Sequence, residues 1–220
     1  MVRIAAGICT YSDSLSLARC LESFAGQLEA IIIHGPYPSY NSLDPSSYQD
    51  TNAVCKAYPN IRLVDVAEPL AEIERRQMYL NLAVNHDFLL ILDSDEFVCD
   101  GANWPLFKAN CKRILESGKH HYIYDIMFDG PAPQAGPRPR LFREPSKIKY
   151  HKKHYWWSLP NGRIAAGASD SAEIVDGIKL MWDDSLRTEE RIKARDEYQA
   201  WLRQDEGRHT ITNRELTGSD

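Results

Sequence analysis

Two aspartates that follow an apolar run are the residues of this chain best suited to chemistry. The run is Phe88-Leu89-Leu90-Ile91-Leu92, and Asp93-Ser94-Asp95-Glu96 comes directly after it. A short continuous apolar run is typical of a strand buried on both faces. In parallel α/β sheets, ligands bind beyond the carboxyl ends of such strands. Because residues i and i+2 of an extended segment point the same way, we expect Asp93 and Asp95 to converge on one point.

Two converging carboxylates repel each other unless a cation lies between them, and hard divalent cations prefer carboxylate oxygens. The alternative interpretation is an ordinary turn, because Asp and Ser are frequent turn residues. The chain continues into Glu96-Phe97-Val98, so the acids lie between two structured segments. We therefore predict a metal site at Asp93 and Asp95.

Residues 147–157 form a second unusual segment, with four lysines, two histidines, two tyrosines and two tryptophans. Interleaved basic and aromatic side chains suit either nucleic acid or a platform for sugar and phosphate. The formal net charge of the chain is −5, which argues against a general affinity for nucleic acid. We therefore expect no nucleic-acid partner.

The composition is that of an ordinary globular protein, with 43% hydrophobic and 26% charged residues in a chain of 220. The five cysteines are scattered and form no C-x-x-C pair, which favours a reduced, intracellular setting. No apolar stretch reaches the length of a membrane span, and the first residues lack the layout of a signal peptide. We expect a cytoplasmic protein with no integral membrane segment.

Hydrophobic periodicity divides the chain into alternating strands and helices. Apolar runs predict strands at 4–9, 30–33, 61–66, 88–92, 120–128 and 140–143. Helical spacing predicts helices at 14–24, 69–85, 105–115 and 188–204. Residues 36–47 and 130–139 are expected to be loops, and 205–220 a polar tail. This order predicts an α/β fold with parallel connections.

The helix at 69–85 and the closing helix at 188–204 each carry an apolar stripe. The first stripe consists of Leu70, Ile73, Leu80 and Val84, with Arg75 and Arg76 beside it. The second consists of Ala194, Tyr198 and Trp201. An apolar stripe at this spacing gives a helix one face to bury.

From Met1 to about Leu202 the chain resembles a GT-A-fold glycosyltransferase of the family 2 type. Four segments carry the resemblance, and they occur in the order found in that family. They are 8–12 with 17–23, then Glu74-Arg75-Arg76-Gln77 followed by 92–96, then Pro139-Arg140-Leu141-Phe142-Arg143 followed by His154, and finally 186–198.

The resemblance implies a GT-A (Rossmann-like) mixed, mostly parallel sheet flanked by helices, in one domain over 1–204. Residues 1–98 would be the half that binds the nucleotide sugar, and 99–204 the acceptor side. It also implies transfer of a sugar from a UDP- or GDP-linked donor to a glycan or another hydroxyl acceptor. The cofactor would be Mn²⁺ or Mg²⁺, held by the DxD motif formed by Asp93 and Asp95.

The same resemblance places the nucleotide sugar against Thr10, Tyr11, Asp44, Arg75, Arg76 and Ser94. The second strand of the family usually ends in an aspartate, whereas here it ends in His34-Gly35-Pro36, so Asp44 would take that role. Guanidinium groups pair well with phosphate. The alternative for the two arginines is a solvated helix face paired with Glu72 or Glu74.

The remaining site residues are expected on the acceptor side. His154 is predicted as a third metal ligand or a diphosphate contact, with Asp183 as a possible substitute. Trp156 and Trp157 would stack on the acceptor sugar or belong to the core. An inverting transfer needs a carboxylate base, for which Asp129 and Asp125 are the candidates, Asp129 first because it lies at a strand end.

Two other functions remain open. A haloacid-dehalogenase-like phosphatase also has an Asp-x-Asp after an apolar strand, with Asp93 then the nucleophile and Lys179 and Asp183 downstream. In that class the motif normally follows the first strand, whereas here it begins at position 93. A non-catalytic protein that binds a nucleotide or a glycan is the second alternative, since a fold does not by itself give a function.

Overall fold

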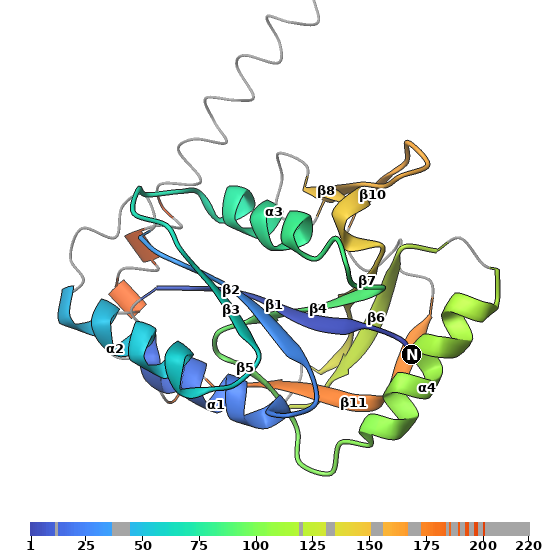
Figure 1. The fold of residues 1–220 in the computed structure, drawn as a ribbon, viewed down its shortest axis with the longest axis horizontal. Helices are drawn as coiled ribbons and strands as arrows, with labels where there is room; N and C mark the ends of the chain where they lie inside the picture. The colour runs from blue at the N-terminus through green and yellow to red at the C-terminus, as the bar shows by residue number, and fades with distance from the viewer. Residues whose placement is uncertain are drawn as a thin grey trace, which may run out of the picture.

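The computed structural model describes residues 1–11, 13–36, 45–118, 121–130, 135–150, 156–166 and 173–183, with isolated positions between 185 and 200. Helices cover both faces of a large sheet, and a second, small sheet lies on one of these faces (Figure 1). The mixed α/β class expected from the sequence is therefore confirmed. Among the described helices, none combines the length and apolar composition that crossing a lipid bilayer requires.

The large sheet has eight strands in the order β3-β2-β1-β4-β7-β6-β11-β5. Their bounds are β1 Ile4–Thr10, β2 Glu29–His34, β3 Ile61–Asp65, β4 Phe88–Asp93, β5 Glu96–Val98, β6 Ile123–Phe128, β7 Gly136–Arg143 and β11 Ile174–Trp182. The small sheet consists of β8 Lys149–Tyr150, β9 Trp156–Ser158 and β10 Ile164–Ala166. The helices are α1 Ser14–Phe24, α2 Pro45–Ala57, α3 Glu72–Leu82 and α4 Trp104–Glu116, with a 3₁₀ turn at Pro145–Lys147.

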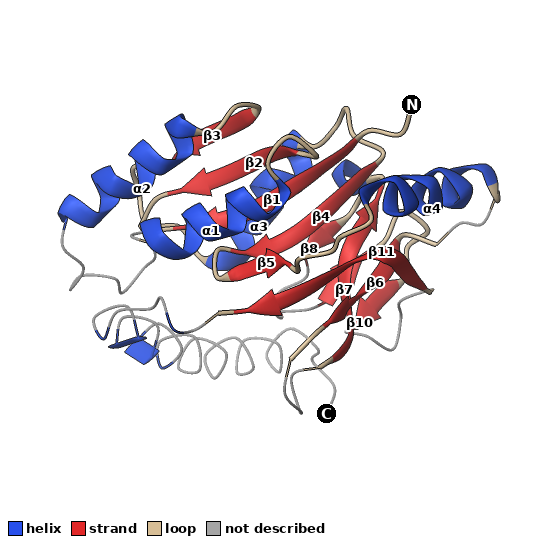
Figure 2. Ribbon diagram, turned by 90° about the horizontal axis from the view of Figure 1, so that it is seen from below, coloured by secondary structure: helices blue, strands red, loops and turns tan. Residues whose placement is uncertain are grey.

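The large sheet is mostly parallel. β1 pairs in parallel with β2 and β4, and β2 pairs in parallel with β3. β7 is antiparallel to both β4 and β6, so β6 runs in the same direction as β4, and β11 is parallel to β6. The carboxyl ends of β1, β4, β6 and β11 therefore share one edge of the sheet, toward which their arrows point in Figure 2.

The hydrophobic core has two layers, one on each face of the large sheet. Along β1, the side chains of Ile4, Ala6 and Ile8 belong to one layer and those of Ala5 and Cys9 to the other. Helices α1, α2 and α4 cover the first face, whereas α3 and the small sheet cover the second (Figure 1). Because both faces of the sheet are buried, side chains on both faces are apolar, and each strand is a continuous apolar run in the sequence.

The structure departs from the expected elements in three places. A helix that the sequence analysis missed, α2, begins at Pro45 inside the expected loop at 36–47. The expected linker at 130–139 contributes the first half of β7, which begins at Gly136. In α3 the buried residues are Arg75, Arg76, Tyr79 and Leu80. Of the predicted apolar stripe, Leu80 is buried as expected, whereas Val84 is 64% exposed.

Further differences lie near the end of the chain. The small sheet and β11 were not predicted. The described positions between 189 and 200 are helical, as expected for the closing helix. Its predicted apolar stripe, Ala194, Tyr198 and Trp201, lies outside the described residues.

Candidate functional site

Polar and acidic residues gather where the parallel strands end. Tyr11 follows β1, Asp93 closes β4, Asp129 follows β6 and Asp183 follows β11. These strands share a direction, so their ends meet at one edge of the sheet. This is the edge at which open α/β sheets bind ligands.

Helix α3 lies close to this edge because β1 carries a glycine beneath it. A Cβ atom at Gly7 would lie 3.1 Å from the ring of Tyr79 and 3.0 Å from a methyl group of Leu89. The absence of that atom lets the Tyr79 ring rest on the strand. The close approach brings Arg75 and Arg76 of the same helix to the carboxyl ends of β1 and β4.

Arg75 is fully buried, and its hydrogen-bond partners are backbone carbonyl oxygens. Its guanidinium group donates to the carbonyl oxygen of Thr10 at 3.4 Å and to the carbonyl oxygens of Gly35 and Pro36. The side chain thus ties the end of β1 to the end of β2. The contacts of Arg75 are thus with backbone carbonyl oxygens, and its predicted contact with the nucleotide stays a prediction. The alternative of a solvated helix face is wrong for Arg75.

Arg76 is also buried, but its partners are acidic side chains. Its Nε donates to Oε1 of Glu72 at 2.7 Å, and its Nη2 lies 2.5 Å from Oδ1 of Asp93. A third contact joins Nη1 to the hydroxyl of Tyr79 at 3.3 Å. Burial alone would lower the pKa of Arg76, but Asp93 and Glu72 raise it well above its usual value. Arg76 is therefore a fixed positive charge. The alternative interpretation is right that Arg76 pairs with Glu72 and wrong that this face of the helix is solvated.

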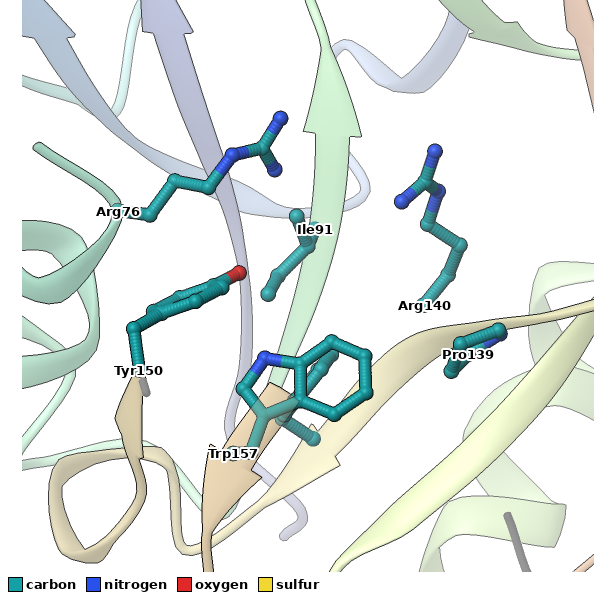
Figure 3. A pocket seen from close by; sticks show the side chains of 7 residues that line it. Arg76, Ile91, Pro139, Arg140, Tyr150 and Trp157 are labelled. Atoms are coloured by element: carbon teal, nitrogen blue, oxygen red, sulfur yellow. The ribbon is translucent and has the colours of Figure 1, made fainter. Parts of the chain in front are cut away.

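Arg140 of β7 approaches Asp93 from the opposite side. Its Nη2 lies 2.5 Å from Oε1 of Glu96 and 3.5 Å from Oδ2 of Asp93. The other Glu96 oxygen accepts the backbone N–H of Asp93 at 3.0 Å. We call Glu72, Arg76, Asp93, Glu96 and Arg140 the carboxylate–arginine cluster. Figure 3 shows the two guanidinium groups on either side of β4.

Burial dominates the electrostatics of the carboxylate–arginine cluster. Glu96 is fully buried, and burial raises its pKa to about 7 against the opposing effect of Arg140. The side chain of Asp93 is the most exposed member, at 33%, whereas those of Arg76 and Arg140 are 6% and 5% exposed. Two rigid guanidinium groups therefore flank a carboxylate that reaches solvent.

The rest of the acidic segment is anchored to the turn after β1. The hydroxyl of Ser94 donates to Oδ2 of Asp13, and the backbone N–H of Asp13 donates to Oγ1 of Thr51 at 3.0 Å. Thr51 belongs to α2 and is fully buried. The helix that was absent from the sequence prediction thus supports the turn next to Asp93, and the hydroxyl of Ser94 is directed at protein.

Asp95 has little exposure, 8%, and its carbonyl oxygen accepts the N–H of Asp183 at 3.0 Å. The carboxylate of Asp183 pairs with Arg19 and accepts from the hydroxyl of Ser185. Arg19 also lies 4.0 Å from the ring centre of Phe97. Asp183 is therefore paired with an arginine, as Asp93 is, and its predicted role as a substitute metal ligand stays a prediction.

The two acids of the Asp-x-Asp would suit a cation that is also coordinated by a bound substrate. Within the described residues, no three His, Cys, Asp or Glu side chains form a metal-binding group. Mg²⁺ and similar ions commonly use one or two carboxylates together with substrate phosphates and water. Asp93 at the end of β4 and Asp95 in the turn after it would be these two carboxylates, which stays a prediction. His154, the predicted third ligand, lies outside the described residues, as does Asp44.

The two candidate bases differ in access. Asp125 lies within β6 and is 7% exposed. Asp129 follows the strand, its side chain is 54% exposed, and Lys179 Nζ lies 3.7 Å from its Oδ2. A base must come within hydrogen-bond reach of the hydroxyl that it deprotonates. The geometry therefore favours Asp129.

The two candidate acceptor tryptophans also have different environments. Trp157 is 2% exposed and packs against Phe142 and Tyr150 at ring distances of 5.2 and 6.1 Å. It belongs to the core on the α3 face, which is the alternative role considered for it. Trp156 is 38% exposed.

Thr10 and Tyr11 also differ in their exposure and in their contacts. Thr10 is fully buried, and its carbonyl oxygen accepts from the N–H of Gly35 at 3.2 Å as well as from Arg75. Tyr11 is half-buried, and its ring lies 6.4 Å from the ring of His34. Of these two predicted contacts, only Tyr11 has a side chain placed to meet a ligand.

Sequence reasoning missed Arg140, Glu96 and Asp13 as members of the site. Glu96 directly follows the Asp-x-Asp, and Arg140 lies in the segment 139–143 that carries part of the family resemblance. Both signals were present, but a buried acid and a strand arginine become partners only when β7 pairs beside β4.

No family model and no curated protein matches the chain. Among solved structures it is similar to residues 1–349 of S. aureus TarS, with a TM-score of 0.47 and 13% identity over 65% of this chain and 47% of that one. The complex of this TarS fragment with UDP-GlcNAc gives a TM-score of 0.45 and 15% identity over 62% and 37% of the two chains.

Two further similar structures carry other names. The bifunctional glycosyltransferase WbbM has a TM-score of 0.35 and 12% identity over 62% of this chain and 27% of its own. Mannose-6-phosphate isomerase from Helicobacter pylori has a TM-score of 0.40 and 11% identity over 60% and 53%. The chain spans about half or less of each of these proteins.

Proposed function

We propose that this protein is a metal-dependent glycosyltransferase that uses a UDP- or GDP-linked sugar as donor and a glycan or another hydroxyl compound as acceptor. The observation that carries the proposal is the sheet edge where Asp93 ends β4 between Arg76 and Arg140, with Asp95 in the turn that follows. Carboxylates for a cation and guanidinium groups for phosphate suit a nucleoside diphosphate. The strand end at Tyr11, beside β4, offers a ring for the base.

In this proposal Asp93 and Asp95 hold Mn²⁺ or Mg²⁺, which supplies Lewis-acid stabilisation of the departing diphosphate. Arg76 adds a fixed positive charge at the same place. Because Arg76 is held by Glu72 and Tyr79, it needs little reorganisation to meet developing negative charge. Arg75 fixes the ends of β1 and β2, between which the nucleoside would lie.

The reaction we propose is an inverting transfer with Asp129 as the base. Its carboxylate takes the proton of the acceptor hydroxyl, the acceptor oxygen bonds to the anomeric carbon, and the bond from that carbon to the diphosphate oxygen breaks. Lys179 lies beside this carboxylate, with its Nζ 3.7 Å from Oδ2 of Asp129. Trp156 is the proposed platform for the acceptor sugar.

The phosphatase alternative fits the structure less well. In it Asp93 would be a nucleophile, but one of its oxygens lies 2.5 Å from Arg76 and the other 3.5 Å from Arg140. Lys179 pairs with Asp129 and Asp183 pairs with Arg19, so neither of the downstream residues is directed at Asp93.

Transfer or hydrolysis of radiolabelled UDP- and GDP-sugars tests the proposal. We expect release of nucleoside diphosphate that requires Mn²⁺ or Mg²⁺, is abolished in Asp95→Ala, and falls at least about a hundredfold in Asp129→Asn. Asp87→Asn, at the other end of β4, is the matched control. Binding of a donor with no turnover under any of these conditions would favour the non-catalytic alternative instead.

A further inference from the structure

The two guanidinium groups of the carboxylate–arginine cluster come from separate, well-anchored elements. Arg76 belongs to α3 and Arg140 to β7, and both side chains are almost fully buried. In Figure 3 they flank the end of β4 above Ile91, beside a narrow hollow that is also lined by Tyr150 and Trp157. Two convergent guanidinium groups are a geometry suited to an anion with several oxygens.

Each arginine keeps an anchor that does not involve Asp93. Arg76 is held by Glu72 at 2.7 Å and by the Tyr79 hydroxyl at 3.3 Å. Arg140 is held by Glu96 at 2.5 Å, and Glu96 is itself fully buried. The two guanidinium groups would therefore stay in place if the carboxylate of Asp93 moved away.

Asp93 is the member of the cluster that is most exposed to solvent. Its side chain is 33% exposed, and its two oxygens each meet a different arginine, Oδ1 at 2.5 Å and Oδ2 at 3.5 Å. A carboxylate in this position presents two oxygens to two guanidinium groups, as one phosphate would. The same carboxylate cannot also give its full coordination to a cation while it is held this way.

We propose that Arg76 and Arg140 form a diphosphate-binding site that the Asp93 carboxylate occupies in the ligand-free protein. Asp93 leaves the arginines when the ligand arrives, and phosphate oxygens take its place. Asp93 thereby acts as an internal competitor for anions that arrive without a cation. The choice of diphosphate as the ligand rests on the proposed function, whereas the competition itself rests on the geometry.

Removal of the Asp93 charge should therefore strengthen anion binding in the absence of metal. We would titrate inorganic pyrophosphate into wild type and Asp93→Asn by calorimetry with EDTA present. The expected result is at least about tenfold tighter pyrophosphate binding to Asp93→Asn, because two buried guanidinium groups then lack one acidic partner. Asp87→Asn, which removes a carboxylate at the other end of β4, should bind as wild type does.

A second change shows where the gain arises. Adding Arg140→Gln to Asp93→Asn should return pyrophosphate binding to the wild-type level or below. Asp93→Ser gives an independent replacement should the amide variant fold poorly, and pyrophosphate should raise its thermal midpoint more than it raises that of wild type. Equal pyrophosphate affinity in wild type and the Asp93 variants would overturn the proposal, as would a gain that survives Arg140→Gln.

Failure of this proposal and failure of the glycosyltransferase proposal are distinguishable. Pyrophosphate binding without metal needs no sugar and no turnover. Tighter binding by Asp93→Asn in a protein that transfers no sugar would support the anion site alone. Metal-dependent transfer by wild type together with unchanged pyrophosphate binding in Asp93→Asn would support the glycosyltransferase proposal and overturn the proposed competition by Asp93.

Discussion

Arg75 and Arg76 are neighbours on α3 and both are buried, yet they serve two different regions at the sheet edge. Arg75 donates to backbone carbonyl oxygens at the ends of β1 and β2. Arg76 pairs with carboxylates, one of which is a third exposed at the end of β4. The difference shows that burial alone does not indicate the role of a guanidinium group. The chemical nature of its hydrogen-bond partners does.

Backbone carbonyls cannot leave an arginine without a change in the fold, whereas an exposed carboxylate can. We therefore interpret the Arg75 region as a structural tie and the carboxylate–arginine cluster as the part that responds to ligands. Substitutions in the two regions should then separate stability from binding.

The largest expected effect is loss of stability in Arg75→Gln. The change removes donors from the carbonyl oxygens of Thr10, Gly35 and Pro36, and a hydrogen bond to a charged group contributes about 1.5–3 kcal/mol. We expect the free energy of unfolding to fall by roughly 3 kcal/mol or more. Urea denaturation of Arg75→Gln and Arg76→Gln measures the difference. Equal losses in the two variants would erase the distinction between the regions.

The next effect is expected at Gly35, which Arg75 holds through its carbonyl oxygen. A Cβ at this position would overlap the carbonyl oxygen of Val66. Gly35→Ala should therefore lower the free energy of unfolding by about 2–3 kcal/mol, because β3 or the chain after β2 has to shift. Gly118→Ala is the control, since its Cβ would meet nothing within 4 Å although its φ is also positive. A Gly35→Ala cost no greater than that of Gly118→Ala would contradict the close approach.

A smaller effect, on binding rather than on folding, is expected for Arg76→Gln. Loss of one charge-assisted contact to phosphate should weaken binding of a nucleoside diphosphate by about tenfold, or about 1.4 kcal/mol. The fold should survive, because Glu72 and Asp93 both reach water. Calorimetry with UDP and GDP measures the change. Undiminished binding would remove Arg76 from the site.

The smallest effect concerns pH and lies in the structural region. His34 is fully buried, and burial lowers its pKa although Asp65, 2.9 Å away, opposes the shift. The unfolded chain therefore takes up a proton more readily, so stability is complete above about pH 6.5 and falls as the pH drops below it. Urea midpoints at pH 7.5 and 5.5 should differ more in wild type than in His34→Gln. Identical differences would show that His34 does not contribute.

Much of the fold was predictable because parallel strands that are buried on both faces consist of continuous runs of apolar residues. The bounds of α1 match the predicted 14–24, and the predicted strands at 4–9, 30–33 and 88–92 lie within β1, β2 and β4. Each of these strands packs on both faces, so nearly every residue is apolar. The placement of Asp93 at a strand end followed from the same signal.

The missed elements have sequences that conflict with their structure. Helix α2 begins with Pro45-Ser46-Ser47, which is typical of a turn, and in its second half Thr51 and Cys55 are buried. β7 contains Pro137 and Pro139, which usually argue against a strand inside a sheet. It pairs with β4 only from Leu141 onward, so its proline-containing half lies beside β6 alone among the strand pairs described.

The sequence pointed to Asp93, Asp95 and Arg76, and it did not point to Arg140, Glu96 or Asp13. Asp93 and Asp95 are adjacent to a strong strand signal, whereas Arg140 lies 47 positions beyond Asp93 and meets it only through the strand order β4-β7. Arg75 and Arg76 are adjacent residues of α3, so their side chains leave the helix in different directions. Sequence periodicity does not show which of the two side chains meets backbone and which meets carboxylates. His154 and Asp44 stay predictions.

Binding of a nucleotide sugar at Asp93 and Asp95 is the central claim, and thermal unfolding tests it most directly. Wild type and Asp95→Asn would be heated with a panel of UDP- and GDP-sugars, each with and without Mn²⁺. We predict that at least one donor raises the wild-type midpoint when Mn²⁺ is present, with about 2.7 kcal/mol of stabilisation at a hundredfold excess over Kd, and that Asp95→Asn folds but loses the shift. A wild-type midpoint that no donor moves, or an equal shift in Asp95→Asn, would contradict it.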